Sequence, residues 1–139
     1  MAHLLRIGTL SHALRHLLGV RDLYNIGTSA SGVDNGICNY DLMAYGNFGF
    51  NNTDYYPTSL SAYHKNFTGW VSHEEIIAAG WFTLWSGIHQ VYKIAHGFPS
   101  SKYLLPKNQQ PVEHNSTITD GGIAIYHVNK QIKKQTFCG

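Results

Sequence analysis

The spacing of the apolar residues changes part-way along the chain, and this change constrains the fold more than any other feature. Near the start, apolar side chains recur every three or four residues, the period of a helix with one buried face. They are Ile7, Leu10, Leu14, Leu17 and Leu18. Beyond residue 70 the apolar residues fall in short aromatic or β-branched runs separated by Gly, Pro, Ser and Asn, as in strands. The sequence therefore predicts an α+β protein.

The change of pattern also predicts two domains, residues 1–70 and 71–139. The first is expected to hold a helix that ends at Gly19, a long irregular loop, and a second helix opened by Pro57 with Thr58 or Ser59 as its cap. These three segments are 7–18, 22–58 and 57–69. The second domain is expected to be an antiparallel β-rich module. Its predicted strands are 80–85, 90–95, 102–105 and 122–128.

Composition excludes several classes of function. The 139 residues carry a formal net charge of +2 and include 43% hydrophobic residues, enough for an ordinary core. No Lys/Arg block extends beyond Lys133 and Lys134, so the chain lacks the basic patch of a nucleic-acid-binding protein. No apolar run approaches the roughly 20 residues that a membrane span needs. Cys38 and Cys138 are equally compatible with a disulfide and with two thiols.

A histidine pair on the first predicted helix is the strongest candidate for chemistry. His12 and His16 lie four residues apart, so both rings can face one metal ion. Gly19 breaks the helix, and Asp22 follows where a chain that turns back can offer a carboxylate oxygen. Two imidazoles, one carboxylate and an open position form a hydrolytic zinc site. The structural alternative is a pair of ordinary histidines, with Asp22 capping a turn.

Other aromatic and histidine residues favour structural roles. Six further histidines show no ligand spacing and are expected at the surface or in the β core; they are His64, His73, His89, His96, His114 and His127. Trp81 and Trp85 are expected to pack between sheet and helix, and the functional alternative is an aromatic platform for a sugar. Met43 is expected to be structural.

Residues 12–24, HALRHLLGVRDLY, resemble the H-E-x-x-H-x-x-G-x-x-D-x-Y stretch of immune inhibitor A-like secreted zinc metalloproteases, a metzincin-type family. Residues 39–46, NYDLMAYG, are similar to the segment of that family whose methionine forms the turn beneath the metal; here it is Met43. Residues 57–70 resemble the helix that closes the catalytic domain, and the later strands resemble the β-rich region after it. These similarities follow one another in the same order as in the family.

The resemblance implies the C-terminal half of a metzincin-like catalytic domain followed by a β-rich module. It implies zinc as the cofactor, held by His12, His16 and Asp22, and a polypeptide as the substrate. Tyr45 lies where related metzincins place a tyrosine that hydrogen-bonds the tetrahedral oxyanion. The family is extracellular, although no signal peptide is recognised at the start of this chain. The oligomeric state stays open.

Two departures from the family pattern limit the expected activity. The position of the glutamate general base is occupied by Ala13, which can neither accept nor donate a proton. Only about ten residues precede His12, so the half-domain with the substrate-binding edge strand is expected to be missing. The chain is therefore predicted to be a weakly active or inactive zinc metalloendopeptidase homologue. The alternative is a non-catalytic β-rich module that binds protein or glycan.

Overall fold

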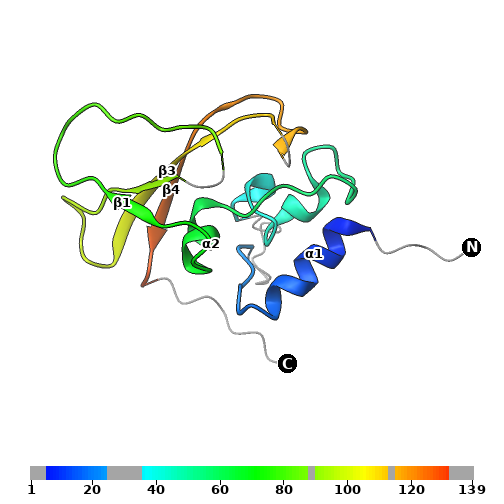
Figure 1. The fold of residues 1–139 in the computed structure, drawn as a ribbon. Helices are drawn as coiled ribbons and strands as arrows, with labels where there is room; N and C mark the ends of the chain where they lie inside the picture. Colours follow the sequence, from blue (N-terminus) through cyan, green and yellow to red (C-terminus); the bar gives the residue numbers. More distant parts are fainter. Residues whose placement is uncertain (1–5, 25–35, 88–89, 113–114, 132–139) are drawn as a thin grey trace, which may run out of the picture. The chain divides into compact units, whose positions relative to one another are not determined.

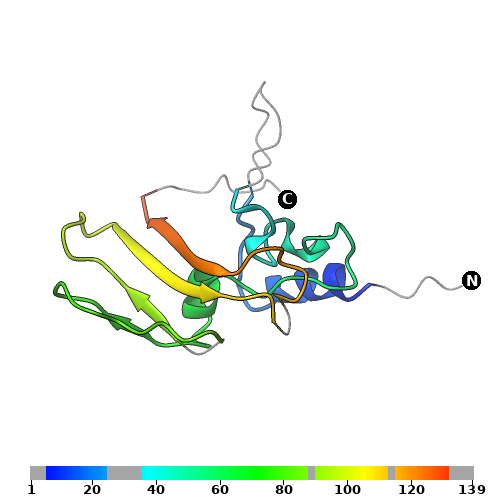
Figure 2. The same ribbon diagram turned by 90° about the horizontal axis from the view of Figure 1, so that it is seen from above.

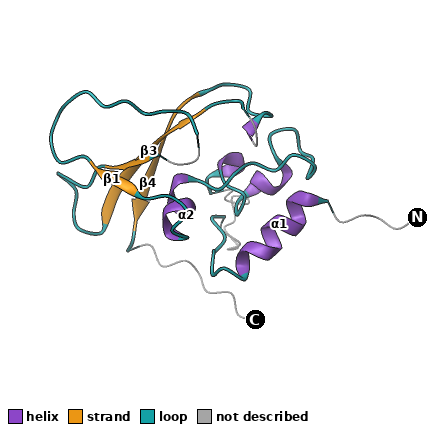
Figure 3. Ribbon diagram, in the orientation of Figure 1, coloured by secondary structure: helices purple, strands orange, loops and turns teal. Residues whose placement is uncertain are grey.

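The computed structural model describes residues 6–24, 36–87, 90–112 and 115–131, and it has mixed α+β character (Figure 1). Figure 3 separates helical from strand segments. The helices are α1 (Ile7–His16), the 3₁₀ helices η1 (Cys38–Tyr40) and η2 (Tyr45–Phe48), and α2 (Ala62–Phe67). The strands are β1 (His73–Glu75), β2 (Val91–Lys93), β3 (Lys102–Gln109) and β4 (Gly122–Asn129). Among these described helices, none has the length and apolar character needed to traverse a bilayer.

The chain divides into two compact units. The helical unit comprises Met1–Ser61, Glu113–Thr117 and Lys134–Gly139, and the sheet unit comprises Ala62–Val112 and Ile118–Lys133. The division falls before α2, whereas the sequence pattern places it after residue 70. The reason is that α2 packs against β3 and β4.

In the helical unit, α1 forms where the periodicity predicts it, and Gly19 ends it with a positive φ of 72°. The prediction that the apolar face of α1 is buried is wrong. Leu14 and Leu17 are 51% and 82% exposed, and Gly8 is the buried residue of the helix. Periodicity identifies the apolar face of a helix, but it does not determine whether another part of the chain covers that face.

The core of the helical unit lies beyond α1, in a cluster formed by Val20, Leu42, Met43 and Leu60. Met43 is completely buried, as expected of a structural residue. The predicted helix start at Pro57 is wrong, because the chain there is tied to the preceding loop. The Thr58 hydroxyl donates to the Asn39 carbonyl at 2.8 Å instead of capping a helix.

The N-terminus of α1 is held by Asp54. The backbone N–H of Gly8 donates to the Asp54 carbonyl, while Arg6 Nη1 and Thr9 Oγ1 donate to its two carboxylate oxygens at 2.9 and 3.1 Å. Burial disfavours the charged carboxylate, but the hydrogen bonds from Arg6 and Thr9 outweigh this effect. The pKa of Asp54 is therefore lowered.

The sheet unit contains two strand pairs of opposite sense. β3 and β4 pair antiparallel over eight residues, from Lys102 opposite Asn129 to Gln109 opposite Gly122. β1 pairs with β2 in parallel, so the expectation of an antiparallel module holds for β3 and β4 and for the isolated antiparallel bridge between Ile94 and Leu104, but not for β1 and β2. Parallel pairing needs a long crossover connection. The segment predicted as a strand at 80–85 belongs to that connection and forms no strand.

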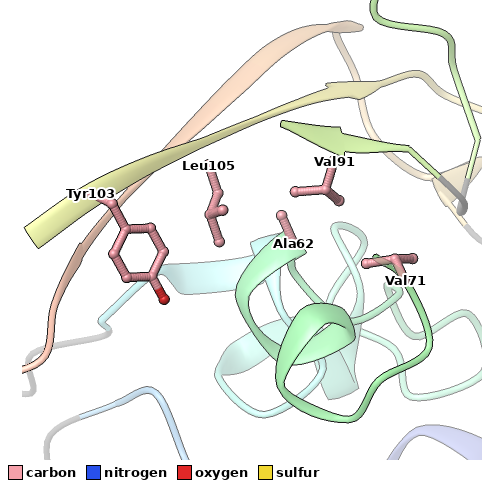
Figure 4. Close-up of a cluster of buried hydrophobic side chains, with 5 residues drawn as sticks. All are labelled: Ala62, Val71, Val91, Tyr103 and Leu105. Atoms are coloured by element: carbon pink, nitrogen blue, oxygen red, sulfur yellow. The ribbon is translucent and has the colours of Figure 1, made fainter. Parts of the chain in front are cut away.

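α2 covers one face of β3 and completes the core of the sheet unit (Figure 2). Residues alternate between buried and half-buried along β3, as expected for a strand with one face against a core. Figure 4 shows the side chains of Val91 and Leu105 pointing towards Ala62 on α2. Tyr103 and Val71 complete the buried cluster.

Candidate metal centre

The structure brings His12, His16 and Asp22 together. Both histidines project from α1, and their Nε2 atoms lie 3.3 and 3.5 Å from the same carboxylate oxygen, Asp22 Oδ1. One ligand atom from each of the three residues lies within 4.8 Å of the others. The two rings are nearly perpendicular, with centroids 5.1 Å apart. Three metal-ligating atoms of the types that zinc prefers therefore converge on one point.

The end of α1 supplies the geometry for the third ligand. The N–H of Gly19 bonds to the His16 carbonyl, and the N–H of Val20 bonds to the carbonyl of Arg15, which satisfies the last turn of the helix. The left-handed conformation of Gly19 reverses the chain. Asp22 is thus carried back towards the helix face that bears the histidines.

Hydrogen bonds to the backbone favour one tautomer of each neutral ring. His12 Nδ1 lies 3.0 Å from the Leu42 carbonyl oxygen, and His16 Nδ1 lies 3.1 Å from that of Val20. A carbonyl oxygen only accepts, so each Nδ1 carries a hydrogen and each Nε2 of a neutral ring presents a lone pair. This arrangement is the usual outer support of a metal-bound imidazole.

The carboxylate oxygen that faces both histidine rings is suited to contact a cation. Asp22 Oδ1 is buried and has no hydrogen-bond partner. It faces two imidazole nitrogens that, in the neutral rings, are also acceptors. Three acceptors at this separation repel one another, and a proton or a metal ion between them removes the repulsion.

The loop that carries Met43 positions the candidate ligands through two backbone carbonyls. The Leu42 carbonyl holds His12, and the Met43 carbonyl accepts from the N–H of Leu23, directly after Asp22, at 2.8 Å. The loop is in turn fixed by Asp41, a fully buried carboxylate that accepts from the backbone N–H groups of Met43 and Ser61 at 2.6 and 2.8 Å. Sequence reasoning did not assign Asp41 a role. The signal for this role in the sequence was an acidic residue directly before the apolar pair Leu42 and Met43.

Two tyrosines extend the site. The Tyr24 ring lies 6.5 Å from the His12 ring and 6.3 Å from the Tyr45 ring, measured between centroids. Burial, followed by the charge of Asp22 and a hydrogen bond to it, raises the pKa of Tyr24, so its phenol stays protonated. Tyr24 was not predicted as a site residue. Tyr45, the predicted oxyanion stabiliser, is next to Tyr24, and its role remains a prediction.

The position that the family resemblance assigns to a general base holds no ionisable group. Ala13 is exposed on α1, next to His12. Glu74 and Glu75 belong to the sheet unit, and Glu113 lies outside the described residues. Among the residues that the structure describes, the group formed with Asp22 is the one set of histidine, cysteine and acidic side chains arranged to hold a metal ion.

Comparisons of the chain with models of protein families, with curated proteins and with solved structures find no match.

Proposed function

We propose that this chain is a zinc-binding homologue of the immune inhibitor A-like metallopeptidases, with His12, His16 and Asp22 as the ligands. The observation that carries the proposal is the convergence of two imidazole nitrogens and one unpartnered carboxylate oxygen. Two nitrogens and one oxygen suit zinc better than calcium or magnesium, which favour oxygen ligands. When bound, zinc polarises carbonyl groups and lowers the pKa of water, the chemistry used in peptide hydrolysis.

The same proposal predicts little or no turnover. Peptide hydrolysis requires a base that takes a proton from water and delivers it to the leaving amine, which contributes roughly 10²- to 10⁴-fold to the rate. Ala13 supplies no such group. Tyr45 as an oxyanion donor, a polypeptide substrate and an extracellular location follow from the family resemblance, and they are part of this proposal.

Metal analysis tests the proposal directly. The purified full chain, loaded with zinc and desalted, is expected to retain one zinc per chain by elemental analysis. His16→Ala and Asp22→Ala should lose it. His96→Ala is the matched control, because His96 is exposed in the sheet unit. A folded wild-type protein that retains no zinc, or a His16→Ala variant that retains it fully, contradicts the proposed site.

An activity assay tests the absence of turnover. Wild-type protein and the variants Ala13→Glu and Ala13→Gln are compared on unfolded casein with zinc, with and without a chelator. Only the glutamate variant is expected to gain chelator-sensitive cleavage, since glutamine matches its size without its basicity. Chelator-sensitive cleavage by the wild type contradicts the predicted inactivity. Wild-type cleavage that survives chelation contradicts the metal mechanism.

The second candidate is a non-catalytic binding module in the sheet unit. One observation favours it. The sequence analysis expected Trp81 and Trp85 to pack between sheet and helix, but both side chains are exposed. A correctly folded protein that binds no zinc in the first experiment supports this candidate.

A further inference from the structure

The connection between β1 and β2 presents an uncharged aromatic surface. No Asp, Glu, Lys or Arg occurs between Glu75 and Lys93. The described part of this connection, residues 76–87, forms a wide loop (Figure 1). Its large apolar side chains are exposed, with Trp81 fully accessible and Trp85 72% exposed. Ile77 and Phe82 are exposed in the same loop, which we call the tryptophan loop.

Side chains from β2, from β3 and from the end of the connection bond to the backbone of the tryptophan loop. The Tyr92 hydroxyl donates to the Thr83 carbonyl at 3.0 Å, and Asn108 Nδ2 donates to the Leu84 carbonyl at 2.9 Å. The N–H of Trp85 donates to Gln90 Oε1 at 2.9 Å. The backbone of residues 83–85, which lies between the two indoles and includes Trp85, is thus bonded to the protein, while the side chains of Trp81 and Trp85 stay exposed.

We propose that the tryptophan loop inserts Trp81 and Trp85 into the interfacial layer of a phospholipid bilayer. Tryptophan concentrates at this layer because its ring is apolar and its N–H can bond to polar headgroups. Entry into the layer penalises charges and unpaired backbone groups. The loop has no charged side chain, and four of its backbone groups, those of Ile76, Thr83, Leu84 and Trp85, already have protein partners. The inference is independent of the proposed metal site.

A sugar fits the surface less well. Carbohydrate recognition needs hydrogen-bonding groups beside the aromatic ring, but Thr83 and Ser86 supply the polar side chains of residues 76–87. The carbonyls of Thr83 and Leu84 are already used. Because the loop carries no basic residue, attachment is expected to occur on zwitterionic lipid and to be insensitive to salt.

The test uses the full chain and phosphatidylcholine vesicles. Wild-type protein is expected to co-sediment with the vesicles, to shift its tryptophan emission to shorter wavelength, and to be quenched by brominated phosphatidylcholine. The double variant Trp81→Ser/Trp85→Ser should lower the partition coefficient more than about tenfold. The reason is that burying even half of one indole in the bilayer interface removes substantial apolar area from water, and the serine side chains do not. Ile125→Ser is the matched control, because Ile125 is 63% exposed on β4 of the same unit.

Several outcomes overturn the inference. Absence of vesicle binding, or binding that disappears at high salt, contradicts interfacial insertion. Blue-shifted emission induced by soluble oligosaccharides, or concentration-dependent association without vesicles, assigns the loop to a glycan or to a second copy of the chain instead. Should the double variant fail to fold, quenching of the wild-type protein by brominated lipid decides alone.

Discussion

Replacing Asp41 with Ala is expected to destabilise the helical unit by at least about 3 kcal/mol. The carboxylate is fully buried and accepts two backbone hydrogen bonds, from Met43 and Ser61. Hydrogen bonds to a charged group contribute roughly 1.5–3 kcal/mol each, and their removal leaves two N–H groups unpaired. The Leu42 carbonyl contacts His12 and the Met43 carbonyl contacts Leu23, next to Asp22, so the proposed zinc binding should weaken as well.

Amide hydrogen exchange of the Met43 and Ser61 N–H groups measures this effect in the helical unit. A loss of 3 kcal/mol corresponds to an exchange rate about a hundredfold faster. Asp120→Ala, which removes an exposed acid of the sheet unit, is the control and is expected to change stability by less than about 0.5 kcal/mol. Unchanged exchange at Met43 and Ser61 in a folded Asp41→Ala protein refutes the idea that this carboxylate holds the loop.

Three further perturbations have defined outcomes. Gly46→Ala should destabilise the helical unit by about 2 kcal/mol or more, because its Cβ would overlap Thr58 Oγ1; a urea midpoint equal to wild type contradicts this. Because the pKa of Asp54 is lowered by folding, its ionised carboxylate stabilises the folded protein above about pH 4, and this stability is lost as pH falls through the folded-state pKa. In Asp54→Asn, the free energy of unfolding should therefore fall less steeply with decreasing pH, measured by denaturation at a series of acidic pH values. Leu105→Ala should cost about 2–5 kcal/mol in thermal unfolding, whereas Ile125→Ala should cost far less because it is exposed.

Local signals predicted the grouping of His12, His16 and Asp22 better than they predicted the fold around it. Helical spacing placed His12 and His16 on one face, and Gly19 supplied the reversal that brings Asp22 to them. These relations span eleven residues of chain and depend on helix geometry and one left-handed glycine. The hydrogen bonds from the two histidine rings to the Leu42 and Val20 carbonyls were not predicted, since backbone carbonyls leave no residue-specific signature.

Non-local relations account for the errors. β1 pairs with β2 across a connection of fifteen residues, 76–90, and nothing in three-residue strands specifies a parallel partner. The segment 80–85 has strand-like composition, yet its backbone hydrogen bonds go to the side chains of Tyr92, Asn108 and Gln90. Composition favours a strand, but the availability of a partner decides whether one forms.

In the proposed site, the groups that orient the ligands are distinct from the position assigned to the general base. The ligands are oriented by the carbonyls of Val20, Leu42 and Met43, and none of these contacts involves the position of Ala13. Ala13 is exposed, so under the proposed function this position supplies no proton carrier, and the contacts that support the ligands do not depend on it. Because the unfolded chain holds no such preformed site, the free energy of metal binding would add to folding stability. Under the proposed function, a zinc ion in this chain therefore acts chiefly as a cross-link between α1 and the segment that follows it.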